Sequence, residues 1–318
     1  GVSASNLADA AMLSRMMVPE MERKGYNRAF AAAITAGGSL VTPIIPPGIA
    51  LIIYGLVADV SIGKMFIAGL VPGLLCAVVL MFTVYLVARK TNAKPSRESW
   101  PTGKEVVFSL GQAWPALFLI FAVVGGIRAN IFTPTEAGAV AVLIVLAIGF
   151  FIYREMRISH VVKALGETAR ATASVMLVIM ASAALGWIFS MEHAGVAVAN
   201  FVTSLTENKY MFLLIINILL LTLGMFLEGN AILLILVPLL KPVVEHFGID
   251  PVHFGIIMIF NLSIGAFTPP VGTVMLLVCN ITQVSVGNFF KQSLPLLAAL
   301  LLMLMLVTYI PAISLFLV

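Results

Sequence analysis

Glycines, prolines and small polar residues interrupt two apolar stretches in the second half of the chain. The first interruption, at 223–230, reads Leu-Gly-Met-Phe-Leu-Glu-Gly-Asn, and the second, at 261–272, reads Asn-Leu-Ser-Ile-Gly-Ala-Phe-Thr-Pro-Pro-Val-Gly. A helix that stops leaves backbone carbonyl groups unpaired at its end, and the next helix begins with unpaired N–H groups. Carbonyl groups suit a hard cation and N–H groups suit an anion. Both stretches are therefore candidates for ion binding.

A weaker copy of this pattern occurs near the start of the chain. Asp9 stands ten residues before Pro19, just as Glu228 stands ten residues before Pro238. Further pairs follow in the same order: Gly25 with Gly248, residues 42–48 with 268–272, residues 60–66 with 284–290, and Pro72 with Pro295. Landmarks that match in one order predict an internal repeat. Interrupted helices in corresponding halves of a chain point to a transport site.

Each copy has oxygen atoms in a hairpin tip and in the break that faces it. A small hard cation needs several oxygen ligands, and neither a tip nor a break supplies enough alone. We therefore expect one cation site across each tip and its facing break, with Asp9 as a candidate support of the first. The expected ligands are Ser3, Ser5, Asn6, Gly38 and Thr42 in the first copy, and Gly224, Glu228, Asn230, Gly265 and Thr268 in the second.

Simpler roles remain open for several of these residues. Glycine and proline in a membrane helix often mark only a kink or close packing. Asp9 and Glu228 could be first-turn acids that the helix dipole stabilises, and Ser3 and Ser5 could be helix caps. Charged groups within a membrane are functional candidates by default, and the matched positions of the two acids favour a role at the site.

The composition predicts an all-α polytopic membrane protein. Hydrophobic residues make up 61% of the 318 residues and charged residues only 10%, and the mean hydropathy is +1.11. A soluble domain has about 25% charged residues. Stretches such as 251–290 and 292–318 lack Asp, Glu, Lys and Arg, and about 20 apolar residues span a bilayer. The net charge of +4 does not indicate nucleic-acid binding, because the basic residues sit in short loops.

The distribution of basic residues predicts how the chain crosses the membrane. The segments 89–104 and 154–163 are the most basic loops, and the positive-inside rule places both on the cytoplasmic side. A separate span is expected at 171–191. Counting spans from the basic loops makes the first hairpin open inward and the second open outward, so the two copies are inverted. The sequence has no nucleotide-binding, zinc-protease or serine-hydrolase motif, which argues against an enzyme.

Five motifs are distinctive: Asn-Leu-Ala-Asp-Ala-Ala at 6–11, Pro-Ile-Ile-Pro-Pro-Gly at 43–48, Phe-Thr-Pro-Thr-Glu-Ala-Gly-Ala-Val-Ala at 132–141, Gly-Ile-Asp-Pro-Val-His-Phe-Gly at 248–255 and Thr-Pro-Pro-Val-Gly at 268–272. Together they resemble the large membrane (M) subunit of tripartite ATP-independent periplasmic (TRAP) transporters, in the ion-transporter superfamily. The similarity covers essentially the whole chain. Two departures are Ser-Ala-Ser-Asn at 3–6, where the family often has Ser-Gly-Ser-Ala, and Glu228, where it usually has Asp.

The resemblance implies a sodium-driven importer of small organic acids, such as a dicarboxylate or a sialic acid, in the bacterial inner membrane. It implies an elevator-type mechanism, a small four-helix membrane subunit as partner and a periplasmic substrate-binding protein. The chain begins at Gly1 without a start Met, so the N-terminal helices of the family are expected to be missing. Substrate is expected to contact Ser39, Pro43, Pro47, Ser263, Pro269 and Pro270, with Na⁺ in the cation sites.

Five segments are expected on this basis. They are a first transport-domain repeat at 1–64, scaffold helices and a cytoplasmic surface helix at 65–165, a connecting span and interfacial segment at 166–207, a second transport-domain repeat at 208–284, and a connector with the last scaffold helix at 285–318. Two alternatives remain open: an ion channel that uses the hairpin tips as a filter, and a membrane scaffold that transports nothing.

Overall fold

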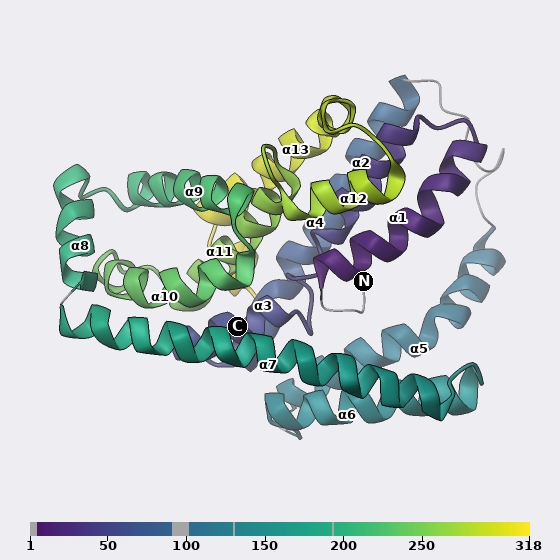
Figure 1. Ribbon diagram of the computed structural model, residues 1–318, viewed down its shortest axis with the longest axis horizontal. Helices are drawn as coiled ribbons and strands as arrows, with labels where there is room; N and C mark the ends of the chain where they lie inside the picture. The colour runs from purple at the N-terminus through teal and green to yellow at the C-terminus, as the bar shows by residue number, and fades with distance from the viewer. Residues whose placement is uncertain (1–4, 91–101, 130, 193) are drawn as a thin grey trace. The chain divides into compact units, whose positions relative to one another are not determined.

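The computed structural model describes residues 5–90, 102–129, 131–192 and 194–318, and these residues form helices without a β-strand among them (Figure 1). Six of the described helices are long and apolar enough to cross a membrane. A seventh span results if α5 (Gly103–Arg128), which bends by 60° between Pro115 and Leu117, counts as one. The structure and composition together confirm the prediction of an all-α polytopic membrane protein.

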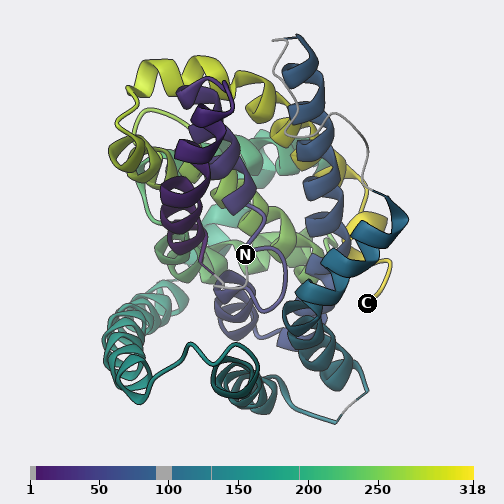
Figure 2. The ribbon, with the colours of Figure 1, turned by 90° about the vertical axis from the view of Figure 1, so that its right-hand side faces the viewer.

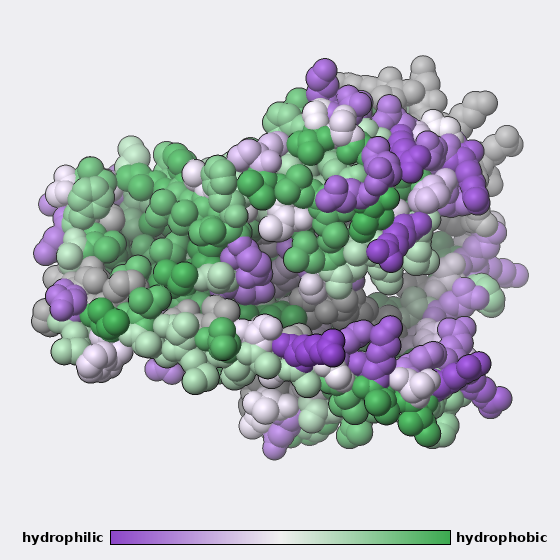
Figure 3. All heavy atoms as spheres, in the orientation of Figure 1, coloured by the Kyte–Doolittle hydropathy of each residue, from purple (hydrophilic) through white to green (hydrophobic). Residues whose placement is uncertain are grey.

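The surface of the molecule carries large apolar side chains of the kind that a bilayer covers. Figure 3 shows a broad hydrophobic surface over the region of α9 (Lys209–Phe226) and α10 (Gly229–His246). Exposed apolar area of this extent is unusual for a soluble monomer. The exposed side chains on these two helices and their connection include Met211, Ile218, Leu219, Phe226, Leu227 and Ile235.

The chain divides into two compact units, Gly1–Ser96 with Phe189–Val318 and Arg97–Ile188. The smaller unit contains α5, α6 (Pro134–Ala147), a π-helical turn at Ile148–Ile152 and most of α7 (Ile158–Met191). Thr133 caps α6, and the Glu136 carboxylate accepts a hydrogen bond of 2.7 Å from the Thr133 backbone N–H. This capping box explains why the Thr-Pro-Thr-Glu motif begins a helix.

The charges predict a loop and a surface helix at 154–163 and a separate span at 171–191. Residues 154–157 do lie outside the helices, but the separation of the span is wrong, because one helix, α7, begins at Ile158 and continues through 171–191. No proline interrupts it, and charged side chains alone do not stop a helix. Lys163 Nζ and Glu167 Oε1 lie 3.9 Å apart, one turn along it, a pairing that gives an exposed helix a small stabilisation.

The larger unit contains both copies of the predicted pattern. The chain breaks between α2 and α3 and again between α11 and α12, at the stretches that are rich in proline and glycine. The helices of this unit are α1 (Asn6–Arg23), α2 (Arg28–Ser39), α3 (Ile49–Ala58), α4 (Ile62–Lys90), α8 (Ala194–Leu205), α9, α10, α11 (Pro251–Phe267), α12 (Thr273–Thr282), α13 (Val286–Tyr309) and α14 (Ala312–Leu315).

Two similar turns start α2 and α11. Gly25 and Gly248 have φ angles of +86° and +60°, a conformation that glycine adopts more readily than residues with a side chain. Two residues later, Asn27 and Asp250 cap the following helix, each accepting a hydrogen bond of 2.8 Å from the backbone N–H two residues further on. The same local chemistry therefore begins the first half of each broken helix.

The helix ends favour a register between the copies that differs from the one predicted by the proline spacing. Ser5 caps α1 and Glu228 caps α10, and the same spacing along the sequence relates the two glycine turns. In this register Glu228 corresponds to Ser5. Asp9 then corresponds to Ile232, so the second copy has no acidic residue at that place.

The broken helices pack across the two copies. α12, from the second copy, packs on α1, and α3, from the first copy, packs on α10. Figure 2 shows α12 beside α1, as Figure 1 does from another side. Helix α11 lies at the centre, with every residue from Val252 to Phe267 buried. The two copies therefore form one body around α11.

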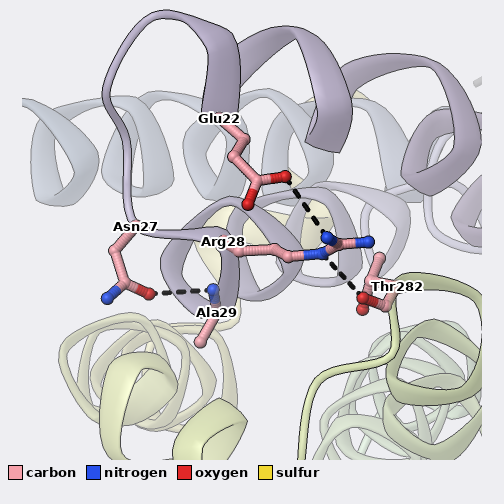
Figure 4. Close-up of polar contacts among 5 residues, drawn as sticks. All are labelled: Glu22, Asn27, Arg28, Ala29 and Thr282. Atoms are coloured by element: carbon pink, nitrogen blue, oxygen red, sulfur yellow. Dashed lines mark hydrogen bonds and ion pairs between the residues drawn. The ribbon is translucent and has the colours of Figure 1, made fainter.

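Polar contacts join the ends of these helices. Arg28 Nε, at the start of α2, donates a hydrogen bond of 2.8 Å to the backbone oxygen of Thr282, at the end of α12. Its guanidinium also lies 3.4 Å from the Glu22 carboxylate (Figure 4). On the other side, the Tyr54 hydroxyl of α3 donates a hydrogen bond of 2.7 Å to the Pro251 oxygen of α11. Each broken helix is thus tied at its end to the first half-helix of the other copy.

We expect Gly69→Ala in α4 to destabilise the larger unit. A β-carbon at Gly69 would collide with the backbone oxygen of Ile44, in the break between α2 and α3, and overpacking of this kind costs about 1–3 kcal/mol. Thermal unfolding in detergent measures the effect. Gly287→Ala in α13 is the control, because nothing lies within 4 Å of its new β-carbon. Equal unfolding temperatures for the two variants would contradict this account of the break.

Candidate functional site

Residues from both copies line a cavity of about 150 Å³ in the larger unit. Its walls come from the start of α1, from the connection between α9 and α10, from the first break at Pro43 and from the face of α11 that carries Ser263. The start of α1 and the connection between α9 and α10 are the two predicted tips. Six of the predicted site residues line it: Ser5, Asn6, Pro43, Glu228, Asn230 and Ser263. Residues that are far apart in the sequence therefore share one space.

The first tip places two of its predicted oxygen ligands at the start of α1. The Ser5 hydroxyl accepts a hydrogen bond of 3.4 Å from the Ala8 N–H, and the Asn6 side-chain oxygen accepts one of 2.9 Å from the Leu7 N–H. Both residues line the cavity. Ser5 is therefore a helix cap, which was one of the alternatives for this residue. A hydroxyl oxygen has two lone pairs, so this role does not exclude a ligand role. Ser3 lies outside the described residues.

Asp9 and Thr42 form a buried pair behind the first tip. The Thr42 hydroxyl donates a hydrogen bond of 2.6 Å to Asp9 Oδ2, and each residue is only 1% exposed. The bond joins α1 to the break that follows α2. Because the Thr42 hydroxyl donates its hydrogen bond to the carboxylate, the lone pairs of its oxygen are available to another partner.

The second tip uses its acidic residue as a cap. The Glu228 carboxylate accepts hydrogen bonds of 2.9 Å from the Ala231 N–H and 2.8 Å from the Asn230 amide. Glu228 is exposed, whereas Asp9 is buried. Among the described residues that line the cavity, Glu228 is the only one with a charged side chain.

Gly224 and Gly265 allow the second tip to lie against its facing helix. A β-carbon on Gly265 would lie 2.7 Å from the Gly224 α-carbon, and one on Gly224 would lie 3.2 Å from the Gly265 α-carbon. The Gly272 N–H also donates a hydrogen bond of 2.8 Å to the Met225 oxygen. Tip and break are therefore in direct backbone contact, as the predicted site requires.

The hydroxyls of the second break are oriented by their own helix. Ser263 donates a hydrogen bond of 2.8 Å to the Ile259 oxygen, and Thr268 donates one of 2.7 Å to the Ile264 oxygen. Both protons are therefore directed into the helix, which leaves the oxygen lone pairs for a donor or a cation. Ser263 lines the cavity, while Thr268 is buried beside Gly265.

Other predicted residues lie apart from the cavity. Ser39 is fully buried and its hydroxyl donates a hydrogen bond of 2.8 Å to the Ala36 oxygen. Pro47, Pro269 and Pro270 belong to the breaks, and both Pro-Pro peptide bonds are cis. None of these four is among the described lining residues. Gly38 is exposed at the end of α2.

Residues that sequence reasoning missed form the remaining wall. Ile49 and Ala50 begin α3, and Thr273 begins α12. Their only signal in the sequence is position, because each follows a glycine that ends a proline-containing break. The remaining lining residues that were not predicted are Leu7, Gly229, Leu233, Ile259, Leu262 and Ala266.

Four helices begin at the cavity. The lining includes the first residues of α1, α3, α10 and α12. Ser5 and Glu228 cap α1 and α10, whereas no described side chain caps α3 or α12. Helix N-termini carry partial positive charge and present N–H groups. The N-termini of α3 and α12 can therefore attract an anion although the described lining has no Lys or Arg, with the Glu228 carboxylate opposing them.

The described residues contain no cluster of three or more His, Cys, Asp and Glu side chains that could hold a metal ion. The oxygen atoms near the tips are instead hydroxyl, amide and backbone carbonyl oxygens, with one carboxylate in each copy. Oxygen ligands of this kind suit hard cations rather than transition metals.

Comparison with known proteins identifies the family. Residues 1–313 match the family described as "Tripartite ATP-independent periplasmic transporter, DctM component". The chain is 39% identical to the C4-dicarboxylate TRAP transporter large permease protein DctM of Pseudomonas aeruginosa, over 99% of this chain and 73% of that protein. It is also 39% identical to the sialic acid TRAP transporter large permease protein SiaM of Vibrio cholerae, over 100% of this chain and 74% of that protein.

A third relative is the isethionate TRAP transporter permease protein DctMQ of Oleidesulfovibrio alaskensis, 37% identical over 99% of this chain and 49% of that protein. These matches extend over nearly the full length of the chain and confirm the family that the motifs predicted. The chain therefore belongs to the tripartite ATP-independent periplasmic transporters, as a large permease component of the DctM family.

Proposed function

We propose that this subunit imports a small organic acid across the bacterial inner membrane, driven by sodium, from a periplasmic binding protein. The two hairpins and two broken helices would form the moving body of an elevator-type transporter. α4, α5, α6 and α13 would belong largely to its scaffold. The substrate class, the coupling ion and the mechanism are proposed here in addition to the family.

The observation that carries the proposal is the convergence of four helix N-termini on one cavity. An acid group can be held there by backbone N–H groups and helix dipoles without a basic side chain. The names of the relatives support the same ligand class, since they refer to C4-dicarboxylates, sialic acid and isethionate. All three are organic acids, and they differ in the rest of the molecule.

Sodium coupling rests on the oxygen atoms that surround the tips. The hydroxyls of Thr42 and Thr268 donate hydrogen bonds to Asp9 and to the Ile264 oxygen, so each offers only lone pairs to a further neighbour. The contact of Gly224 with Gly265 brings backbone carbonyl groups of a tip and a helix close together. A cation that bridges tip and break would fix the shape of the cavity, and this coupling must be reciprocal with substrate binding.

The partners follow from the family, whose large permease works with a small membrane subunit and a periplasmic binding protein. The alternative of an ion channel has no support from the relatives, whose names describe transporters and permeases. Saturable uptake that follows the sodium gradient distinguishes the two, because a channel would conduct without it.

We expect Ser5→Ala and Thr268→Ala to raise the sodium concentration for half-maximal uptake. Loss of one oxygen ligand should cost about 1.4 kcal/mol, which corresponds to roughly tenfold weaker binding. Uptake into proteoliposomes at varied sodium, with equal amounts of protein, measures the effect. Glu228→Gln separates the charge of this residue from its capping role, because an amide oxygen can still accept the Ala231 hydrogen bond.

Two control variants change residues that lie away from the site but make hydrogen bonds like those of Ser5 and Thr268. Ser285 caps α13 through a hydrogen bond of 3.4 Å, the same as that of Ser5. The Thr282 hydroxyl donates a hydrogen bond of 2.7 Å to a carbonyl one turn back, as Thr268 does. Ser285→Ala and Thr282→Ala should leave the sodium dependence unchanged. If Ser5→Ala, Thr268→Ala and the double variant also leave it unchanged, the breaks are structural kinks.

We expect uptake to require the periplasmic binding protein. The described lining of the cavity offers neither Lys nor Arg as a clamp for an acid, so free substrate should bind weakly to the membrane subunits. Proteoliposomes with both membrane subunits and a sodium gradient should take up substrate only after the binding protein is added. Efficient uptake of free substrate without this third component would refute the prediction.

A further inference from the structure

His253 occupies a buried joint between α11 and the end of the chain. It is the third residue of α11 and is 2% exposed. Its Nδ1 lies 2.6 Å from the Ser314 hydroxyl of α14, and its Nε2 lies 3.3 Å from the backbone oxygen of Thr308 in α13. One imidazole ring therefore connects three helices.

The partners of His253 allow two protonation states. The Thr308 carbonyl can only accept, so Nε2 carries a proton in this geometry. The Ser314 hydroxyl has two acceptors within reach, because its oxygen also lies 3.1 Å from the Pro311 oxygen. When the hydroxyl donates to Nδ1, the ring is neutral. When the hydroxyl donates to Pro311, Nδ1 must carry a proton, and the ring is an imidazolium.

Both states satisfy every polar atom of the joint without moving a heavy atom. In the neutral state, Ser314 donates to Nδ1 and Nε2 donates to Thr308. In the charged state, Nδ1 donates to Ser314, Ser314 donates to Pro311, and Nε2 still donates to Thr308. Only the serine hydroxyl turns. A buried polar group is costly when it loses its partners, and this arrangement avoids that cost on protonation.

A second cavity lies beside the ring, and several titratable side chains line it. It has a volume of about 190 Å³ and is lined by His253 and Thr308, among others. The titratable groups that also line it are Lys209 and Tyr210 of α9, Asp250 at the start of α11, and Tyr309 of α13. Asp250 favours a cation in this space and Lys209 opposes it. Water in a cavity of this size can exchange protons with the ring.

We propose that His253 is a reversible proton-binding site. One proton from water adds to Nδ1, the Ser314 hydroxyl turns to Pro311, and no other bond changes. Both ring N–H groups then make charge-assisted hydrogen bonds, which are about twice as strong as neutral ones. Proton uptake therefore tightens the joint of α11 with α13 and α14. This proposal does not depend on the proposed transport function.

The test is a histidine titration by NMR on the full chain in nanodiscs. His160, His193 and His246 are replaced by Gln, which leaves His253 as the one histidine. Its ring should pass from one protonated nitrogen to two as the pH is lowered, over a range in which the protein remains folded. A ring that stays neutral while the protein remains folded would overturn the proposal. A protein that retains only the exposed His246 is the control for a solvated ring.

Two variants should shift the titration in opposite directions. Ser314→Ala removes the acceptor of the Nδ1 proton and should weaken proton affinity by about tenfold. Lys209→Gln removes the opposing charge and should strengthen it. Absence of both shifts would show that the ring titrates without this joint, against the proposal.

A third variant tests the tightening. His253→Gln retains a donor for Thr308 but cannot become charged. Amide exchange at 308–315, corrected for the intrinsic effect of pH, should slow at low pH in the protein with His253 and not in His253→Gln. Equal pH dependence in the two proteins would contradict the tightening.

Discussion

Backbone groups that end inside an apolar layer constrain the rest of this fold. A helix that stops at membrane depth leaves N–H and carbonyl groups that lipid cannot satisfy, at a cost of several kcal/mol for each group. Helices α2 and α11 stop in this way, and α3 and α12 begin again a few residues later. The protein satisfies part of this need internally, as when the Gly272 N–H donates to the Met225 oxygen. The remaining N-termini face the cavity.

The crossed packing of the two copies follows from the same constraint. A half-helix of ten residues, such as α3 or α12, is too short to span the bilayer. It needs protein around its ends, and the hairpin of the other copy supplies it. Arg28 holds the last carbonyl of α12, and Tyr54 of α3 holds the first carbonyl of α11. Glycines at close approaches, among them Gly69 against Ile44 and Gly224 against Gly265, let backbone pack on backbone.

Much of this architecture could be predicted from local chemistry. Prolines and glycines fix where α2 and α11 stop, and Gly25 and Gly248 fix the turns before them. The register between the copies could not be obtained from proline spacing, because α10 contains two prolines, Pro238 and Pro242. An alignment of Pro19 with Pro238 makes Asp9 correspond to Glu228, whereas an alignment of the helix caps makes Ser5 correspond to Glu228.

The cavity wall was predictable only in part. Polar residues at the tips, such as Ser5 and Asn230, could be predicted from their residue type, and they do line the cavity. Ile49 and Ala50 do not, because an apolar residue at the start of an apolar helix resembles any core residue. Their contribution to the cavity is their position at the start of a helix. The backbone N–H groups there cannot be predicted from the type of side chain. The continuity of α7 was missed for the opposite reason, since its charged residues suggested a surface helix separate from the following span, although nothing in its backbone ends the helix.

The two copies solve the same backbone problem with different chemistry. In the first copy the acid is buried behind the break, where the Asp9 carboxylate accepts a hydrogen bond from the Thr42 hydroxyl. In the second the acid is exposed at the tip, where Glu228 accepts the N–H groups of its own helix. A buried carboxylate strengthens a neighbouring cation site through a low-dielectric medium, whereas an exposed one is screened by solvent. If each copy binds a cation, as we propose, the two sites would therefore not be equivalent, even though their backbones follow one pattern.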